Sequence, residues 1–345
     1  MKRRKIWNVW MAAGIIGTII FAWVVAFPPA LWAQTKPVVW NLPHVAAPTY
    51  YLTVNLKSFA DKVKEKSKGR MEIRVHPASS LYPGPELIPA LIEGRAEIAP
   101  VLSGYLVDLL LPMGVLELPF MTSSVEEHRL AAEKLRPFFT DQFAKKGLML
   151  MTIHPWPSQQ LYSTKKPIAK VEDWKGTKIR TTGAEQTELV KALGGAPVNV
   201  AFGEVYTALQ RGIIEAAITS ATNAEPMKFF EVSKYINYWF INGFYLEFLG
   251  INKKAWDGLT PDLRQVVTAS LKESRFEEKS WEDGISWDAR AKKRVQELGM
   301  TVIDVPKSEI EKARKLSRPS WDIWLKRTGA DGKQALDLAL KALGR

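Results

Sequence analysis

Cysteine is absent from the chain. Disulfide bridges, thiol catalysis and thiolate metal sites are therefore excluded, and a fold of this size must rely on its hydrophobic core. Histidine is scarce, because the sequence has only four histidines and none lies three or four residues from another. Helical zinc motifs are thus absent, as are a G-x-S-x-G elbow, a phosphate loop and a dinucleotide fingerprint. These absences argue against an enzyme.

The first residues form an export signal. Four positive charges lie within Met1–Lys5, an uncharged apolar run of 19 residues follows from Val9 to Phe27, and small residues recur up to Ala33. The run is close to the ~20 residues that span a bilayer, so the segment 1–33 is either cleaved or retained as an anchor. Both alternatives place the rest of the chain in the periplasm or on the outer face of the cytoplasmic membrane.

The remaining chain is long and basic. Its length of 345 residues exceeds the usual span of one hydrophobic core, which predicts two lobes. The signal holds four Lys or Arg and no acid, so the net charge of +12 falls to +8 in the mature part. The charges are dispersed without an arginine–aromatic cluster, and together with export this argues against nucleic acid as a partner. An anionic ligand or a solvated basic surface explains the charge better.

Hydrophobic periodicity predicts an α/β fold. Apolar residues at helical spacing after Pro48 precede an alternating segment around Ile73, and short apolar strands alternate with helices in both halves of the chain. The predicted strands are 38–42, 71–75, 96–101, 177–181, 196–200 and 213–218, and the predicted helices between them end near 69, 93, 193 and 210. The pattern A-L-x-x-G-x-x-E occurs at 90–97 and again at 208–215, which supports two similar lobes. Such alternation predicts mixed, mostly parallel sheets flanked by helices.

The tail is predominantly helical. Thr260-Pro261-Asp262 is typical of a helix start, and charge-dense helix is predicted to about Leu298. A returning strand at 300–305 and a helical end of about forty residues follow.

An ordered set of motifs resembles one family. The set is Glu117-Leu118-Pro119-Phe120, Lys165-Lys166-Pro167-Ile168, D-W-K-G-T-K-I-R-T-T-G at 173–183, A-L-G-G-A-P-V at 192–198, G-E-V-Y-T-A-L-Q-R-G at 203–212 and I-N-K-K-A-W at 251–256. With these segments the chain resembles the solute-binding proteins of tripartite ATP-independent periplasmic (TRAP) transporters, the DctP family. The resemblance covers nearly the whole mature chain, in the family's order. It implies a two-lobed periplasmic-binding-protein-like fold with a long strap helix near residue 285.

The resemblance implies lobe boundaries and a carboxylate anchor. Lobe I would comprise 34–156 plus 243–285, and lobe II 157–242 plus 286–345. In the family, the arginine of the K-I-R strand forms a two-pronged salt bridge with the ligand carboxylate, and here that residue is Arg180. A guanidinium presents parallel donors that match a carboxylate.

Gln160 departs from the family's pattern. Many relatives carry a second arginine there, so the glutamine suggests a monocarboxylate, a neutral polar tail or a bound cation. In some relatives a glutamine and a downstream glutamate hold a metal ion, and Gln160 with Glu247 is the candidate pair here. No other cofactor is expected. The remaining candidate ligand contacts, taken from their positions, are Thr219, Ser220, Asn223, Glu86, Tyr82, Trp156, Trp239 and His44.

The implied mechanism is hinge closure around a small organic acid, followed by docking on the small and large membrane subunits of a TRAP permease. Two alternatives stay open. One is a sensor accessory protein that presents its loaded ligand to a receptor. The other is an exported hydrolase or lyase that uses Glu86, His44 or His154 and therefore turns its ligand over.

Overall fold

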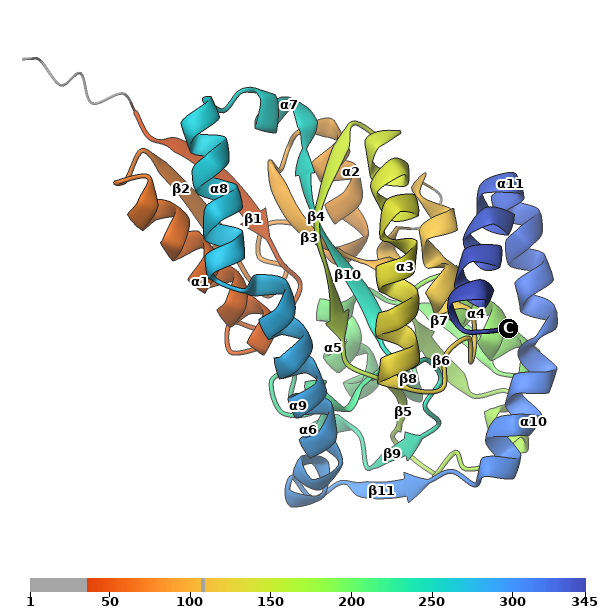
Figure 1. Ribbon diagram of the computed structural model, residues 1–345. Helices are drawn as coiled ribbons and strands as arrows, with labels where there is room; N and C mark the ends of the chain where they lie inside the picture. The colour runs from red at the N-terminus through yellow and green to blue at the C-terminus, as the bar shows by residue number, and fades with distance from the viewer. Residues whose placement is uncertain (1–35, 107–108) are drawn as a thin grey trace, which may run out of the picture. The chain divides into compact units, whose positions relative to one another are not determined.

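Two sheet systems and the helices around them make up the fold (Figure 1). The structure is a computed structural model that describes residues 36–106 and 109–345, so the export signal predicted for 1–33 lies outside the described residues. The strands are β1 (Val38–Pro43), β2 (Met71–His76), β3 (Ile98–Leu102), β4 (Leu148–Trp156), β5 (Gln159–Ser163), β6 (Lys178–Thr181), β7 (Ala196–Asn199), β8 (Ala216–Ser220), β9 (Tyr235–Tyr238), β10 (Tyr245–Asn252) and β11 (Thr301–Asp304).

The α-helices cover these strands. They are α1 (Tyr51–Lys66), α2 (Leu87–Glu93), α3 (Val125–Ala144), α4 (Ala184–Ala192), α5 (Val205–Gln210), α6 (Phe229–Val232), α7 (Lys253–Asp257), α8 (Pro261–Glu273), α9 (Phe276–Glu297), α10 (Lys307–Ser317) and α11 (Pro319–Ala342). Within the described ranges, none of them combines the length and the apolarity that crossing a bilayer requires.

The first sheet system consists of two small sheets. Strands β1 and β2 pair in parallel, and β10 lies between β3 and β4 and is antiparallel to both. The second system is one six-stranded sheet with the order β11-β9-β5-β8-β6-β7, in which β6 is parallel to both β7 and β8 while β5 is antiparallel to β8 and β9. The predicted mixed α/β architecture is thereby confirmed.

The repeated A-L-x-x-G-x-x-E pattern forms the same turn twice. Gly94 after α2 and Gly212 after α5 both have a left-handed backbone, with φ of 75° and 68°. In each turn the residue after the glycine donates its N–H to the carbonyl of the pattern's first alanine, at 2.8 Å to Ala90 and 3.0 Å to Ala208. Glycine ends helices in this way because the left-handed conformation costs it little. The strand after the second turn begins later than predicted, at Ala216.

Three connections pass between the two sheet systems. The first is the short link Pro157–Ser158 between β4 and β5, and the second is the segment 239–244 between β9 and β10. The third is α9, which contacts β4 and α1 of the first system and β11 of the six-stranded sheet. Figure 1 shows α9 continuing from α8 toward the turn before β11. The single helix expected up to about Leu298 is divided at Arg275, whose φ of 50° separates α8 from α9.

The last helix also contacts elements from both systems. Helix α11 packs against α3 and the 3₁₀ helix η4 (Leu111–Glu117), and against α4 after the six-stranded sheet's strand β6. Its backbone departs from helical geometry at Gly329. The Trp321 indole N–H donates to the carbonyl of Pro119 at 3.3 Å. This packing buries one side of the tail that the sequence predicted to be helical.

Candidate functional site

Arg180 is the next-to-last residue of strand β6, and its side chain is buried. It is 2% exposed, and two of its guanidinium nitrogens donate to backbone carbonyls: Nε to Val200 and Nη1 to Ile218, each at 3.0 Å. Its Nη2 lies 3.5 Å from the Tyr105 hydroxyl. Because a guanidinium carries five N–H donors, one N–H on each Nη is left for an incoming acceptor.

The charge of Arg180 is not balanced by an acid in the part of the chain that the structure describes. Within the described ranges, no aspartate or glutamate forms an ion pair or hydrogen bond with it. Burial lowers the pKa of Arg180, and only the nearby Tyr105 and Tyr245 act in the opposite direction. An unpaired buried charge costs several kcal/mol. A carboxylate bound end-on to the two Nη atoms would remove this cost and satisfy the remaining donors.

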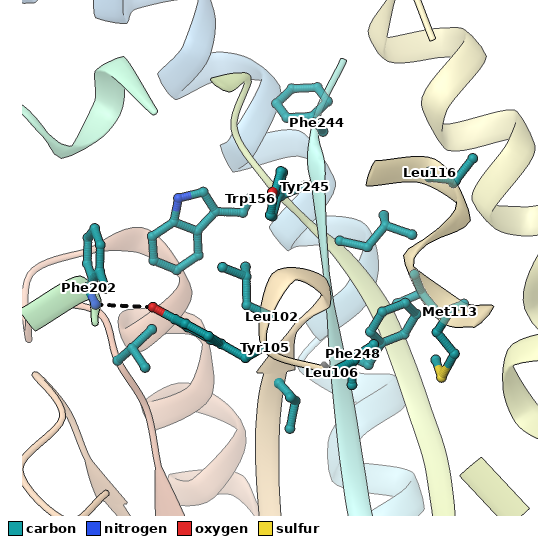
Figure 2. Packing of buried hydrophobic residues seen from close by; sticks show 14 of the residues in the cluster. Leu102, Tyr105, Leu106, Met113, Leu116, Trp156, Phe202, Phe244, Tyr245 and Phe248 are labelled. Carbon is teal, nitrogen blue, oxygen red and sulfur yellow. Dashed lines mark hydrogen bonds between the residues drawn. The ribbon is translucent and has the colours of Figure 1, made fainter. Parts of the chain in front are cut away.

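Tyr105 adds a second donor beside this guanidinium. It ends the 3₁₀ helix η2 (Ser103–Tyr105), which follows β3 of the first sheet system. Its hydroxyl oxygen accepts the backbone N–H of Phe202 at 3.1 Å, so it links the two sheet systems (Figure 2). In this contact and in the one with Arg180 the oxygen is the acceptor, so the hydroxyl proton remains available. The sequence analysis did not predict this polar role of Tyr105.

Aromatic rings enclose the same region. Trp156, at the end of β4, stacks on Tyr50 with ring centroids 4.9 Å apart and meets the edge of Phe202 at 5.6 Å. Figure 2 shows Phe202, Trp156 and Tyr105 pointing toward one another from different elements. The predicted Trp156 thus contacts Phe202, whose N–H is bonded to Tyr105 beside Arg180. Phe202 was not predicted, although it directly precedes the G-E-V-Y motif.

The polar residues at the end of β8 directly follow a backbone carbonyl to which Arg180 donates. The carbonyl that holds Nη1 belongs to Ile218, and the next two residues are the predicted Thr219 and Ser220. Their hydroxyls are buried: Thr219 accepts from the Asn223 amide at 2.9 Å, and Ser220 bonds the Thr222 hydroxyl at 2.8 Å. The structure therefore brings this predicted trio together.

His44 and Glu247 form a separate buried group with His154. The carboxylate of Glu247 lies 3.1 Å from His154 Nε2 and 3.4 Å from His44 Nε2, and all three side chains are fully buried. Burial alone would raise the pKa of Glu247, but the two histidines outweigh it and lower the pKa to about 2. The negative charge of Glu247 is thus stabilised by the two histidines.

The expected cation pair is not brought together. Gln160 lies in the six-stranded sheet and Glu247 in the three-stranded one. The Gln160 amide donates to the Ser158 hydroxyl at 3.1 Å and accepts the N–H of Phe240 at 3.0 Å. No group of three or more His, Asp or Glu side chains suited to a metal ion occurs in the part of the chain that the structure describes.

Three further candidates have other environments. Trp239 belongs to the core of the six-stranded sheet, where its indole N–H donates to the carbonyl of Ile168 at 2.7 Å. Tyr82 lies against Arg95 at 5.1 Å, and Glu86 is exposed. Position along the chain could not reveal this, because it does not show whether a side chain points inward.

Glu117 is a buried acid that the sequence analysis did not single out. It is 1% exposed; Ser103 donates a hydrogen bond to its Oε1, and its Oε2 has no partner among the described residues. Burial raises the pKa of Glu117 well above its ordinary value, and the bond from Ser103 only partly opposes this. Burial therefore favours the neutral form of this carboxyl group in the folded protein.

Replacing this acid, Glu117→Gln, is expected to stabilise the protein at pH 8 but not at pH 4. A raised folded-state pKa gives a contribution that is complete below the unfolded pKa of about 4.3 and is lost as pH rises. The amide of the variant does not titrate. The difference in free energy of unfolding between the variant and the original protein should therefore grow by up to about 1.4 kcal/mol for each pH unit above that point. Urea unfolding of both proteins at pH 4, 6 and 8 measures it. A difference that is constant with pH would contradict the assignment.

Comparison with known proteins identifies the fold and the family. A model of the DctP family, described as bacterial extracellular solute-binding protein family 7, matches residues 42–327. A solute-binding protein of Chromohalobacter salexigens is 26% identical over 308 residues, which cover 88% of each chain. The crystal structure of DctP7, a Bordetella pertussis extracytoplasmic solute receptor binding pyroglutamic acid, aligns with a TM-score of 0.82 and 28% identity over 88% of this chain and 99% of that one.

A second solved structure has a similar fold. A marine metagenome TRAP solute-binding protein specific for pyroglutamate, from an unidentified microbe, aligns with a TM-score of 0.79 and 27% identity over 89% of this chain and 99% of that one. These proteins are receptors and not enzymes. The chain belongs to the DctP family of bacterial extracellular solute-binding proteins.

Proposed function

We propose that this receptor takes a small monocarboxylate and that Arg180 is its carboxylate anchor. The observation that carries the proposal is the buried guanidinium, which has free donors and no acidic partner among the described residues. The Tyr105 hydroxyl supplies a third donor beside it. Neutral Gln160 stands where many relatives carry a second arginine, which favours one carboxylate over two.

Within this class we propose pyroglutamate as the first candidate. The two solved relatives described above, both more than 25% identical, are described as binding it. Pyroglutamate combines one carboxylate with a neutral lactam, which matches one arginine accompanied by neutral polar groups at the end of β8. The flat ring also suits the aromatic walls formed by Trp156 and Phe202.

The other sequence-based candidates remain predictions. His44 and Glu86 would contact the solute only after a change of partners or of position, and the same holds for Tyr82 and Trp239. A bound cation at Gln160 and Glu247 has no support from their present partners. We expect solute capture to need no cofactor.

We further propose that the two sheet systems are two lobes, 34–156 plus 243–285 and 157–242 plus 286–345, that close over the solute. Residues 1–33 export the chain, and the loaded form docks on the small and large subunits of a membrane permease. Delivery to a sensor is the alternative, and finding genes for permease subunits beside this one would favour transport.

Mass spectrometry of the purified mature protein, followed by calorimetry, tests the solute class. We expect pyroglutamate to bind one to one and unchanged, succinate to bind more weakly, and 2-pyrrolidinone, which keeps the lactam but lacks the carboxylate, not to bind. Equal binding of 2-pyrrolidinone would exclude a carboxylate anchor. Tighter binding of succinate would overturn the monocarboxylate assignment, and any reaction product would favour the enzyme alternative.

A further inference from the structure

The side-chain amide of Gln160 bonds to two of the three segments that join the sheet systems. Its Nε2 donates to the hydroxyl of Ser158 in the first connection, at 3.1 Å. Its Oε1 accepts the backbone N–H of Phe240 in the second connection, at 3.0 Å. Gln160 is 0% exposed, and both polar atoms of its amide are therefore used inside the protein.

The third connection joins the same network through Asp288 of α9. Both the N–H and the hydroxyl of Ser158 donate to Asp288 Oδ1, at 3.1 and 2.7 Å. Burial raises the pKa of Asp288, and the two bonds from Ser158 oppose that rise. One continuous chain of hydrogen bonds thus runs from Phe240 through Gln160 and Ser158 to Asp288 of α9. Hydrogen bonds in such buried chains strengthen one another.

The backbone at Phe240 shows why the second connection needs this bond. Its φ of 49° lies in the left-handed region, which a residue with a bulky side chain rarely adopts. A strained conformation of this kind persists only where surrounding contacts impose it. Its N–H is held by Gln160, and the N–H of Ile241 is held by the carbonyl of Gln159 at 3.2 Å.

We propose that Gln160 is a positioning residue for solute capture, which couples the three connections so that they bend together. Lobe closure requires all three to change conformation, and coupling makes partly closed states unfavourable. A closed state that is less uniquely defined releases its solute faster, since apparent affinity scales with the population of the competent state. Gln160 thereby acts without contacting the solute. The inference rests on the proposed function, because it assumes that the two lobes close over a solute.

The first test needs no solute. In Gln160→Met, amide hydrogen exchange should accelerate about ten-fold at Phe240 and also at Ser158, whose N–H is bonded to Asp288 and not to Gln160. In Asp288→Ala, exchange should accelerate at Phe240, which Asp288 does not contact. The matched control is Gln159→Met. The side chain of this neighbouring buried glutamine donates to the carbonyl of Pro157 in the first connection, and its backbone carbonyl, which holds Ile241, is unchanged by the substitution.

The second test measures pyroglutamate release by stopped flow. Gln160→Met should release it about ten-fold faster, roughly the effect of losing one buried hydrogen bond, whereas Gln159→Met should change the rate less than about two-fold. The double variant with Asp288→Ala should be no faster than the faster single variant, because both disrupt one network. Additive effects, or equal effects of the two glutamine variants, would overturn the proposal.

The outcomes separate this inference from the proposed function. If pyroglutamate fails to bind the unaltered protein, the solute assignment is wrong, and the exchange measurements alone decide the coupling. Faster exchange confined to Phe240 in Gln160→Met, with no response at Ser158 and none at Phe240 in Asp288→Ala, would show that Gln160 is a local structural residue only. If the carboxylate bound Gln160 directly, Asp288→Ala would leave the release rate unchanged, and that result would also reject the proposal.

Discussion

Arg180→Met should weaken binding of the carboxylate solute by about 100- to 1,000-fold, while the solute-free protein unfolds at nearly the same urea concentration. Removing one partner of a buried ion pair costs about 3–5 kcal/mol, and the lower part of this range, about 3–4 kcal/mol, corresponds to this loss of affinity. In the solute-free protein the same change removes two bonds to the Val200 and Ile218 carbonyls but also removes an unpaired buried charge. These two effects oppose each other. Calorimetry with pyroglutamate and urea unfolding measure both.

Two variants control this experiment. Arg180→Lys keeps the charge but loses the planar fork, so its affinity should lie between those of the original protein and Arg180→Met. Arg211→Met removes the same charge from an exposed position after α5 and should leave affinity unchanged. A loss of less than about three-fold in Arg180→Met would remove Arg180 from the site, whatever the effect on stability.

Gly183→Ala is expected to weaken solute binding about 100-fold by keeping the two sheet systems apart. Gly183 precedes α4, and a Cβ there would lie 2.6 Å from the carbonyl oxygen of Gly104, which belongs to η2 of the other system. The neighbour is backbone, so no rotamer change relieves the clash. The φ of −145° is accessible to alanine, and the fold itself should survive. The affinity measured by calorimetry and the radius of gyration measured at saturating solute report the effect.

Gly203→Ala is the matched control, because a Cβ at Gly203 would meet nothing closer than 3.7 Å. That variant should bind the solute normally and close normally. We expect Gly183→Ala to keep a larger radius of gyration with solute present, while its circular dichroism matches that of the control. Unchanged affinity in Gly183→Ala would show that the approach of Gly104 to Gly183 is not part of the solute-bound state.

The local elements were predictable because their signals are local. Alternating burial in Met71–His76 and the apolar face of Tyr51–Lys66 follow from the geometry of a strand and a helix. The turns at Gly94 and Gly212 were predictable because few residues other than glycine adopt that backbone. The later start of β8 was missed, since Ile213 is apolar yet 51% exposed in the turn before the strand.

The partners of buried polar groups were not predictable in this way. Tyr105 and Phe202 meet across 97 positions of sequence, and the link from Ser158 to Asp288 spans 130. Gln160 illustrates the consequence. Its residue type and position suggested a contact with solute or metal, but its amide is bonded to Ser158 and Phe240, which no periodicity in the sequence indicates.

The amino-acid sequence by itself therefore determined the α/β class, the net positive charge of the chain, the family through its ordered motifs, and Arg180 as the candidate anchor. Only the tertiary structure decided that this arginine is buried, with no acid bonded to it among the described residues, that Tyr105 and Phe202 accompany it, and that Trp239 packs in the core. The physical reason is that burial periodicity is a property of each helix or strand alone. Hydrogen-bond and charge partners depend on which elements the complete fold brings together.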